Sequence, residues 1–114
     1  MAQWTIGVPY TLSATANLPL VNANEWAVGR WIVHVTIGGS ATVKPQKRVT
    51  VTSGTAPTYA DCWYTLALTN AEIAAGTTQT STCILDIDAS GCDVQLVTTI
   101  ATSTIILVAW PLVG

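Results

Sequence analysis

The sequence has few charged residues and no phenylalanine. Charged side chains make up 9% of its 114 residues, whereas a typical soluble domain has about 25%. Only four residues are Lys or Arg, six are Asp or Glu, and the net charge is −2. A nucleic-acid surface needs clustered cations against the phosphates. Nucleic acid is therefore not an expected partner.

Long hydrophobic runs are also missing, although 50% of the residues are hydrophobic. The longest run, Ile105 to Leu112, is much shorter than the ~18–20 residues of a membrane-spanning helix. The N-terminal stretch MAQWTIGVPY has no basic region ahead of an apolar core, so we expect no secretory signal. These absences predict a soluble protein without a membrane partner, made in the cytoplasm and not exported.

Closely spaced cysteine pairs are absent as well. The three cysteines are Cys62, Cys83 and Cys92. A zinc site would need ligands spaced as in C-x-x-C, and an odd count with wide spacing does not suggest a disulfide framework. We expect small, buried, reduced thiols. One disulfide between neighbouring strands stays open as an alternative in an oxidising compartment.

The stretch DIDASGCD begins like a calcium-binding loop. Asp86, Asp88 and Ser90 would occupy the first, third and fifth ligand positions, ahead of a glycine at the sharp turn. The final bidentate acid would fall on Val97, and the flanking segments look like strands rather than helices. Asp, Ser and Gly are ordinary turn formers because they make local hydrogen bonds and tolerate positive φ. We therefore expect a turn between two strands, with no metal and no cofactor.

No motif indicates catalysis. His34 is the only histidine, no G-x-S-x-G string is present, and none of the sparse acids is singled out as half of a catalytic pair. We expect His34 to be a structural histidine, no catalytic residue, and a protein that is not an enzyme. The alternative of a small hydrolase would need His34 beside an acid and a hydroxyl.

Strand patterns dominate what is present. In RWIVHVTIGG, Trp31, Val33, Val35 and Ile37 alternate with residues that point the other way. In the next segment, Pro45 lacks a backbone donor and predicts two short strands joined near residues 44–47. The segment TIILVAW predicts a strand that is central in its sheet or buried on both faces.

Together these patterns predict an all-β protein with one domain over residues 1–114. We expect about seven to nine short strands in a β-sandwich, jelly-roll-like or immunoglobulin-like. A single helical turn is expected near residues 69–76, because Thr69 and Glu72 have capping-box spacing and Gly76 would end it. Both terminal segments are apolar and are expected to pack against this domain or a neighbouring chain.

Tryptophan is abundant, with five residues in the chain. We expect Trp31 and Trp63 to fill the core. Surfaces for partner contact are predicted at the tryptophans near strand or chain ends, the basic cluster KPQKR and the C-terminal apolar segment. These interface candidates are Trp4, Trp26, Lys44, Lys47, Arg48, Trp110 and Leu112. The basic cluster has the alternative of being only a solvated turn.

The low charge is the most informative property for function. Monomeric proteins usually stay soluble with many mixed charges and small apolar patches. Strand-rich chains with few charges risk edge-to-edge pairing, and burial in a symmetric oligomer or larger assembly removes that risk. We therefore expect a structural subunit that binds copies of itself.

Three stretches carry a resemblance: WIVHVTIGGSATVKPQ, DIDASGCDVQLVTT and IILVAWPLVG. In size and residue pattern, over most of the chain, they are similar to the small all-β accessory proteins of tailed bacteriophage virions. Such proteins decorate or cement capsids, or form parts of tails. The resemblance implies a β-sandwich or jelly-roll-like fold, oligomers such as trimers, and binding to the major capsid protein or other virion proteins, but no catalytic residue.

The leading hypothesis is accordingly a capsid decoration protein. It would be made in the cytoplasm of a bacterial host, lie on the capsid exterior and stabilise the particle by bridging capsomers. The alternative is a carbohydrate-binding or adhesive β-sandwich module on a tail or fibre. That alternative predicts exposed Trp or Tyr beside Asn and Asp, whereas the leading hypothesis predicts Trp4, Trp26 and Trp110 buried at chain contacts.

Overall fold

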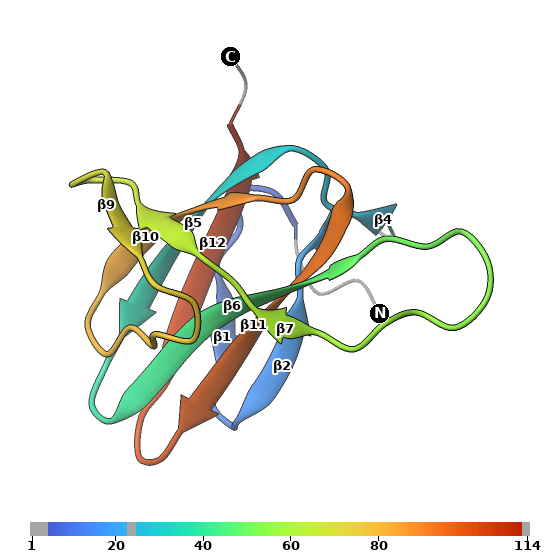
Figure 1. Ribbon diagram of the computed structural model, residues 1–114. Helices are drawn as coiled ribbons and strands as arrows, with labels where there is room; N and C mark the ends of the chain where they lie inside the picture. Colours follow the sequence, from blue (N-terminus) through green and yellow to red (C-terminus); the bar gives the residue numbers. More distant parts are fainter. Residues whose placement is uncertain (1–4, 23–24, 113–114) are drawn as a thin grey trace.

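The computed structural model describes residues 5–22 and 25–112, which form strands and turns (Figure 1). The strands are β1 (Tyr10–Leu12), β2 (Ala16–Pro19), β3 (Val21–Asn22), β4 (Glu25–Trp26), β5 (Arg30–Ile37), β6 (Ala41–Val49), β7 (Ala60–Asp61), β8 (Tyr64–Leu66), β9 (Ala71–Ile73), β10 (Cys83–Asp88), β11 (Cys92–Ile100) and β12 (Ile105–Pro111). Every strand pairing is antiparallel. The predicted all-β sandwich is confirmed.

The order of the strands identifies the kind of sandwich. One sheet has the order β1-β12-β5-β10-β8-β9 and the other the order β2-β11-β6-β7, with β3 and β4 as a separate ribbon. The pairs nest along the chain, with β1 against β12, β2 against β11, β5 against β10 and β6 against β7. This nested pairing is that of an eight-stranded jelly roll. Of the two sandwich types expected, the structure therefore has the jelly roll.

The number of strands exceeds the predicted seven to nine. The described residues contain twelve strand segments, of which β3, β4, β8 and β9 lie outside the jelly-roll pairs. Each of these four is only two or three residues long. A segment this short holds too few residues to show an alternation of polar and apolar side chains, so pattern analysis misses it.

The helical turn expected near residues 69–76 is wrong. Glu72 lies in β9, which forms a hairpin with β8. Asn70 has a φ of 54°, a left-handed conformation that a right-handed helix cannot accommodate. The hydroxyl of Thr69 accepts a 3.4 Å hydrogen bond from the backbone N–H of Ala71, two residues on, as in a local turn. The spacing of Thr69 and Glu72 therefore reflects a turn followed by a strand and not the start of a helix.

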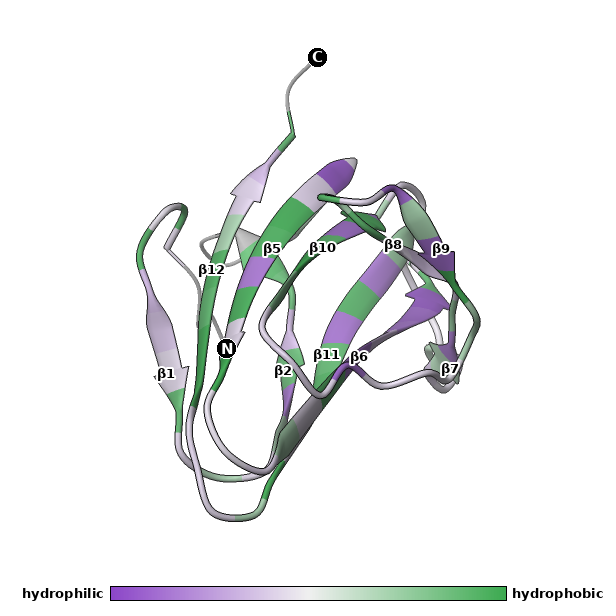
Figure 2. Ribbon diagram, turned by 90° about the vertical axis from the view of Figure 1, so that its left-hand side faces the viewer, coloured by the Kyte–Doolittle hydropathy of each residue, from purple (hydrophilic) through white to green (hydrophobic). Residues whose placement is uncertain are grey.

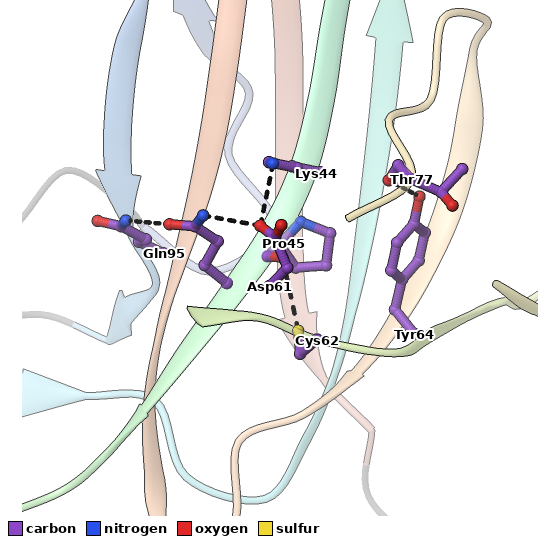
Figure 3. Close-up of polar contacts among 8 residues, drawn as sticks. Lys44, Pro45, Asp61, Cys62, Tyr64, Thr77 and Gln95 are labelled. Carbon is purple, nitrogen blue, oxygen red and sulfur yellow. Dashed lines mark hydrogen bonds and ion pairs between the residues drawn. The ribbon is translucent and has the colours of Figure 1, made fainter. Parts of the chain in front are cut away.

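The predicted break at Pro45 is also wrong, since β6 runs unbroken through it. The carbonyl of Pro45 accepts a hydrogen bond from the thiol of Cys62 at 3.5 Å, on the β7 side of the strand (Figure 3). The nitrogen of a strand residue faces the same side as its carbonyl, and β7 pairs only with Gln46 and Lys47. The missing N–H of Pro45 therefore costs β6 no ladder bond.

The core lies between the two sheets. Trp31, Val33 and Val35 were predicted to share a face, and all three are buried in it. Strand β12 lies between β1 and β5 in its sheet, which confirms the expectation of a central strand. Every second residue from Ile105 to Ala109 is buried. The residues between them are only half-buried and Trp110 is 38% exposed, so β12 is not buried on both faces.

Candidate functional site

The outer face of the six-stranded sheet has an apolar half and a charged half. Alternation along β12, β5 and β10 directs every second side chain away from the core. Cross-strand register sets these outward side chains in rows. One row is Trp110, Ile32 and Asp86, and another is Val108, His34 and Ile84. The apolar side chains gather on β12 and continue at one position each of β5 and β10, whereas the charges lie at Arg30 of β5 and on β10 and β9.

We call the apolar half the outer apolar patch, and it consists of Ile32, Ile84, Ile106, Val108 and Trp110. The four aliphatic side chains are half-buried, yet none belongs to the core cluster or packs against it. Figure 2 shows hydrophobic colour along most of β12, whereas β11 alternates between hydrophobic and hydrophilic. The solvent-facing side of an antiparallel sheet is normally polar. The patch is thus an exception that the core does not explain.

Further exposed apolar residues lie near the end of β12. The N–H of Gly7 donates a 3.0 Å hydrogen bond to the carbonyl of Ala109, which holds this segment beside β12. Ile6 and Val8, on either side of Gly7, are 44% and 50% exposed. Leu112, directly after β12, is 42% exposed. The described parts of both terminal segments therefore pack against this domain and still present apolar surface.

The predicted interface residues do not gather in one place. Trp110 and Leu112 lie together at the end of β12. Trp4 lies outside the described residues. Trp26, in β4, is half-buried and packs against the core. The structure thus brings Trp110 and Leu112 together at one place and sets Trp26 beside Arg48 at another.

The basic cluster KPQKR does not form a single cationic patch. The Nζ of Lys44 lies 2.9 Å from Oδ1 of Asp61, and the Nε of Arg48 lies 3.1 Å from Oδ2 of Asp93. Strand alternation places Lys47 on the opposite side of β6 from Lys44 and Arg48. Two of the three cations are therefore already paired with carboxylates, and the third faces elsewhere.

A row of polar contacts crosses the outer face of the four-stranded sheet (Figure 3). The amide of Gln95 donates to Gln46, and the amide of Gln46 donates to Asp61, both at 2.8 Å. The bond from Gln46, followed by the contact with Lys44, lowers the pKa of the Asp61 carboxyl. This face is polar and its groups satisfy one another, in contrast to the outer apolar patch.

Arg48 is held by aromatic rings as well as by a carboxylate. Its guanidinium lies 5.5 Å from the ring centroid of Trp26 and 4.4 Å from that of Tyr59, within the range of cation–π attraction. Asp93 is buried and also accepts a 2.8 Å hydrogen bond from the hydroxyl of Thr50. These contacts give Arg48 a role in packing the sandwich edge.

A shallow concavity of ≈ 320 Å³ is lined by residues of the charged half of the outer face and by Lys47 of β6, which belongs to the other sheet. Six of the side chains that line it are Arg30, Lys47, Trp63, Glu72, Asp86 and Asp88. Trp63 is 58% exposed, so its predicted core position is wrong. Its neighbour Tyr64 takes the inward position and donates a 2.7 Å hydrogen bond to the carbonyl of Thr77. Alternation then turns Trp63 outward, a signal already present in the sequence.

The carboxylates of the DID motif are held in place by local partners. Arg30 donates from Nε to Oδ1 of Asp86 at 3.2 Å, and its second nitrogen binds Oδ2. Asp88 accepts a 2.9 Å hydrogen bond from the backbone N–H of Ser90, and contacts with Ser90 lower its pKa. Gly91 has a φ of 71°, so the predicted turn is confirmed. Among the described residues, no group of three or more His, Cys, Asp or Glu could hold a metal ion.

Neither the thiols nor the histidine lines the concavity. All three cysteines are free and half-buried, and burial raises the pKa of each thiol. His34 lies in a row between Val108 and Ile84, where a hydrolase would need an acid and a hydroxyl. In residues 5–22 and 25–112, no hydrogen bond or ion pair to its ring is found. The hydrolase alternative gains no support from this arrangement.

Comparison with family models, with curated proteins and with solved structures gives no match to this chain. In the part of the chain that the structure describes, no helix is long and apolar enough to cross a membrane. Any functional conclusion therefore depends on the fold and the outer face themselves.

Proposed function

We propose that the protein is a structural subunit of a virion, most simply a capsid decoration protein, and that it assembles through the outer apolar patch. The observation that carries this proposal is the set of apolar side chains on the outer face of β12, β5 and β10. Large exposed apolar surfaces on soluble proteins usually mark interaction sites. Jelly rolls are a fold of viral capsid domains, which supports a role in a particle but does not by itself assign one.

The composition of the outer apolar patch suits a protein interface. Trp110 stands beside Ile32 in the cross-strand register, and buried aromatic residues often dominate binding energy. Complete burial of partly exposed apolar area gains roughly 25 cal/mol per Å². A standard interface buries about 800 Å² on each partner, so the proposed interface also takes in the exposed Ile6, Val8 and Leu112. The proposed interface therefore includes the end of β12.

Copies of the same chain are the first partner. The patch lies on paired strands, so its shape is rigid and can recur identically around a symmetry axis. We expect a closed homo-oligomer such as a trimer, which then binds the major capsid protein on the capsid exterior. After synthesis in a bacterial cytoplasm, the subunit would act mechanically and without catalysis.

The solution mass of variants tests the interface. Val108→Lys places a charge in the middle of the outer apolar patch and is expected to convert the oligomer into monomers. Val97→Lys is the matched control, because Val97 is a half-buried valine on the outer face of β11, opposite Asn17 and Lys44. Light scattering after size exclusion measures both. Trp110→Ala is expected to weaken assembly as well.

Two results would overturn the assembly proposal. One is a wild-type protein that stays monomeric at high concentration, and the other is equal loss of mass in the Val108 and Val97 variants. Circular dichroism of each variant shows whether the fold is intact. The virion assignment has its own test, which is mass spectrometry of purified virus particles whose genome encodes this chain. Absence of the protein from these particles would contradict a decoration role.

A further inference from the structure

Trp63 presents a large apolar ring that neither the core nor the outer apolar patch uses. It is 58% exposed, although Trp is among the most buried residue types on average. It lines the concavity directly before β8, while Tyr64 fills the inward position beside it. The indole is thus available as a flat platform at the edge of a hollow surface.

Hydrogen-bonding groups with restrained positions surround this platform. Asp86 and Asp88 project from the same side of β10, and contacts with Arg30 and Ser90 hold them. On the same row as Asp86, Thr65 of β8 is followed by Glu72 of β9, so the carboxylates span roughly two strand spacings, ~10 Å. Ligand sites combine an apolar surface with a few placed polar groups in this way.

The charges of the concavity restrict the class of ligand. Three carboxylates line it, which disfavours a phosphate or an acidic sugar. Arg30 and Lys47 line it too, which disfavours a quaternary ammonium despite the exposed indole. A metal ion would find both carboxylate oxygens of Asp86 occupied by Arg30. A neutral polyhydroxylated ligand fits best, because each hydroxyl both donates and accepts hydrogen bonds.

We infer that this concavity binds a neutral saccharide. One face of a pyranose ring packs on the indole of Trp63, and its hydroxyls donate to the carboxylates and accept from Arg30 and Lys47. The open, shallow shape suits an oligosaccharide lying across the surface. This site lies beside the outer apolar patch and its argument does not depend on the proposed assembly.

Binding is tested with a panel of neutral oligosaccharides made of glucose, N-acetylglucosamine, mannose and galactose units. Two-dimensional ¹H–¹⁵N spectra follow the five indole N–H groups, and Trp63→Ala identifies the Trp63 signal. We expect at least one sugar to shift that signal most. By calorimetry, Trp63→Ala should then weaken binding by about tenfold or more, the equivalent of ~1.4 kcal/mol. Glu72→Gln should weaken it several-fold.

Trp110→Ala is the matched control, since Trp110 is also a partly exposed Trp on the same outer face. Trp110→Ala is expected to change the solution mass, while its sugar affinity stays within about twofold of the wild type. The assembly proposal and the saccharide proposal can therefore be rejected independently of each other. No response to any neutral sugar, or unchanged affinity in Trp63→Ala, would overturn the saccharide site. A Trp63 shift caused by choline or inorganic phosphate in place of sugars would also overturn it.

Discussion

Arg48 donates from Nε to Oδ2 of Asp93 at 3.1 Å, and Asp93 is only 4% exposed. Removing the carboxylate would leave the guanidinium of Arg48 and the hydroxyl of Thr50 without their acceptor in a poorly hydrated site. We expect Asp93→Ala to lower the free energy of unfolding by about 2–3 kcal/mol. Urea denaturation at fixed protein concentration measures this.

Asp61→Ala is the matched control for that prediction. Asp61 also pairs with a cation, Lys44, but its side chain is 42% exposed, and exposed ion pairs contribute little. Its loss is expected to destabilise the protein much less than Asp93→Ala. Equal effects of the two substitutions would show that burial of Asp93 is not what makes its contacts matter.

Acid should destabilise the protein through Asp88 and Asp61. Local hydrogen bonds lower the pKa of both carboxyls in the folded state. A lowered folded pKa adds stability above the unfolded pKa of about 4, and this stability is lost as the pH falls through the folded pKa. The urea concentration at the midpoint of unfolding should therefore decrease as the pH is lowered below about 4. It should decrease less steeply in Asp88→Asn.

A carboxyl titration by NMR isolates the cause at Asp88. Hydrogen bonds from the side chain and the backbone of Ser90 are the main causes of the lowered pKa of Asp88. Ser90→Ala should therefore raise the Asp88 pKa. Ser81→Ala, at another exposed serine, should leave it in place. If the Asp88 pKa is the same in both variants, Ser90 is not the stabilising partner.

The three thiols should react slowly in the folded protein. Burial raises the pKa of Cys62, Cys83 and Cys92, and the thiolate is the reactive form. With a chromogenic disulfide reagent near pH 8, we expect slow release of colour in buffer and complete, rapid reaction in denaturant. Immediate reaction of all three thiols without denaturant would contradict this description of their surroundings.

The turn between β8 and β9 should depend on the residue at position 70. Asn70 has a φ of 54°, which costs most side chains roughly 1–2 kcal/mol and glycine almost nothing. We expect Asn70→Val to destabilise the protein by about that amount and Asn70→Gly to be neutral or slightly stabilising. Thermal unfolding of the pair provides the comparison, and equal melting temperatures would argue against a left-handed residue here.

Local pattern predicted the strands that carry the core. In β5, alternation alone placed Trp31, Val33 and Val35 on one face, because neighbouring side chains of a strand must face opposite ways, and the structure buries that face. The turn after Asp88 was predictable for an equally local reason, the turn chemistry of Asp, Ser and Gly. In β12 the residues are apolar on both faces, so the pattern could not show which side chains face outward.

The candidate site was predicted less well. Trp110 and Leu112 were predicted at a partner surface, and both lie partly exposed at the end of β12. Trp63 was placed in the core because a chain without phenylalanine must fill its core partly with tryptophan. The error arose because the residue type of Trp63 was given more weight than its alternation with Tyr64 along the strand. The cluster Lys44–Arg48 was treated as one patch because its members are adjacent in sequence, although a strand separates adjacent residues to opposite faces.

Residue order along the chain thus determines, through alternation and turn chemistry, that this protein is built of strands with one buried face each. Only the folded structure reveals which strands become neighbours, because strand order depends on contacts between distant segments, such as Tyr10 opposite Leu107. That order makes the jelly roll. It also joins outward residues of β12, β5 and β10 into one apolar surface and sets Trp63 beside Asp86, relationships that no single strand contains.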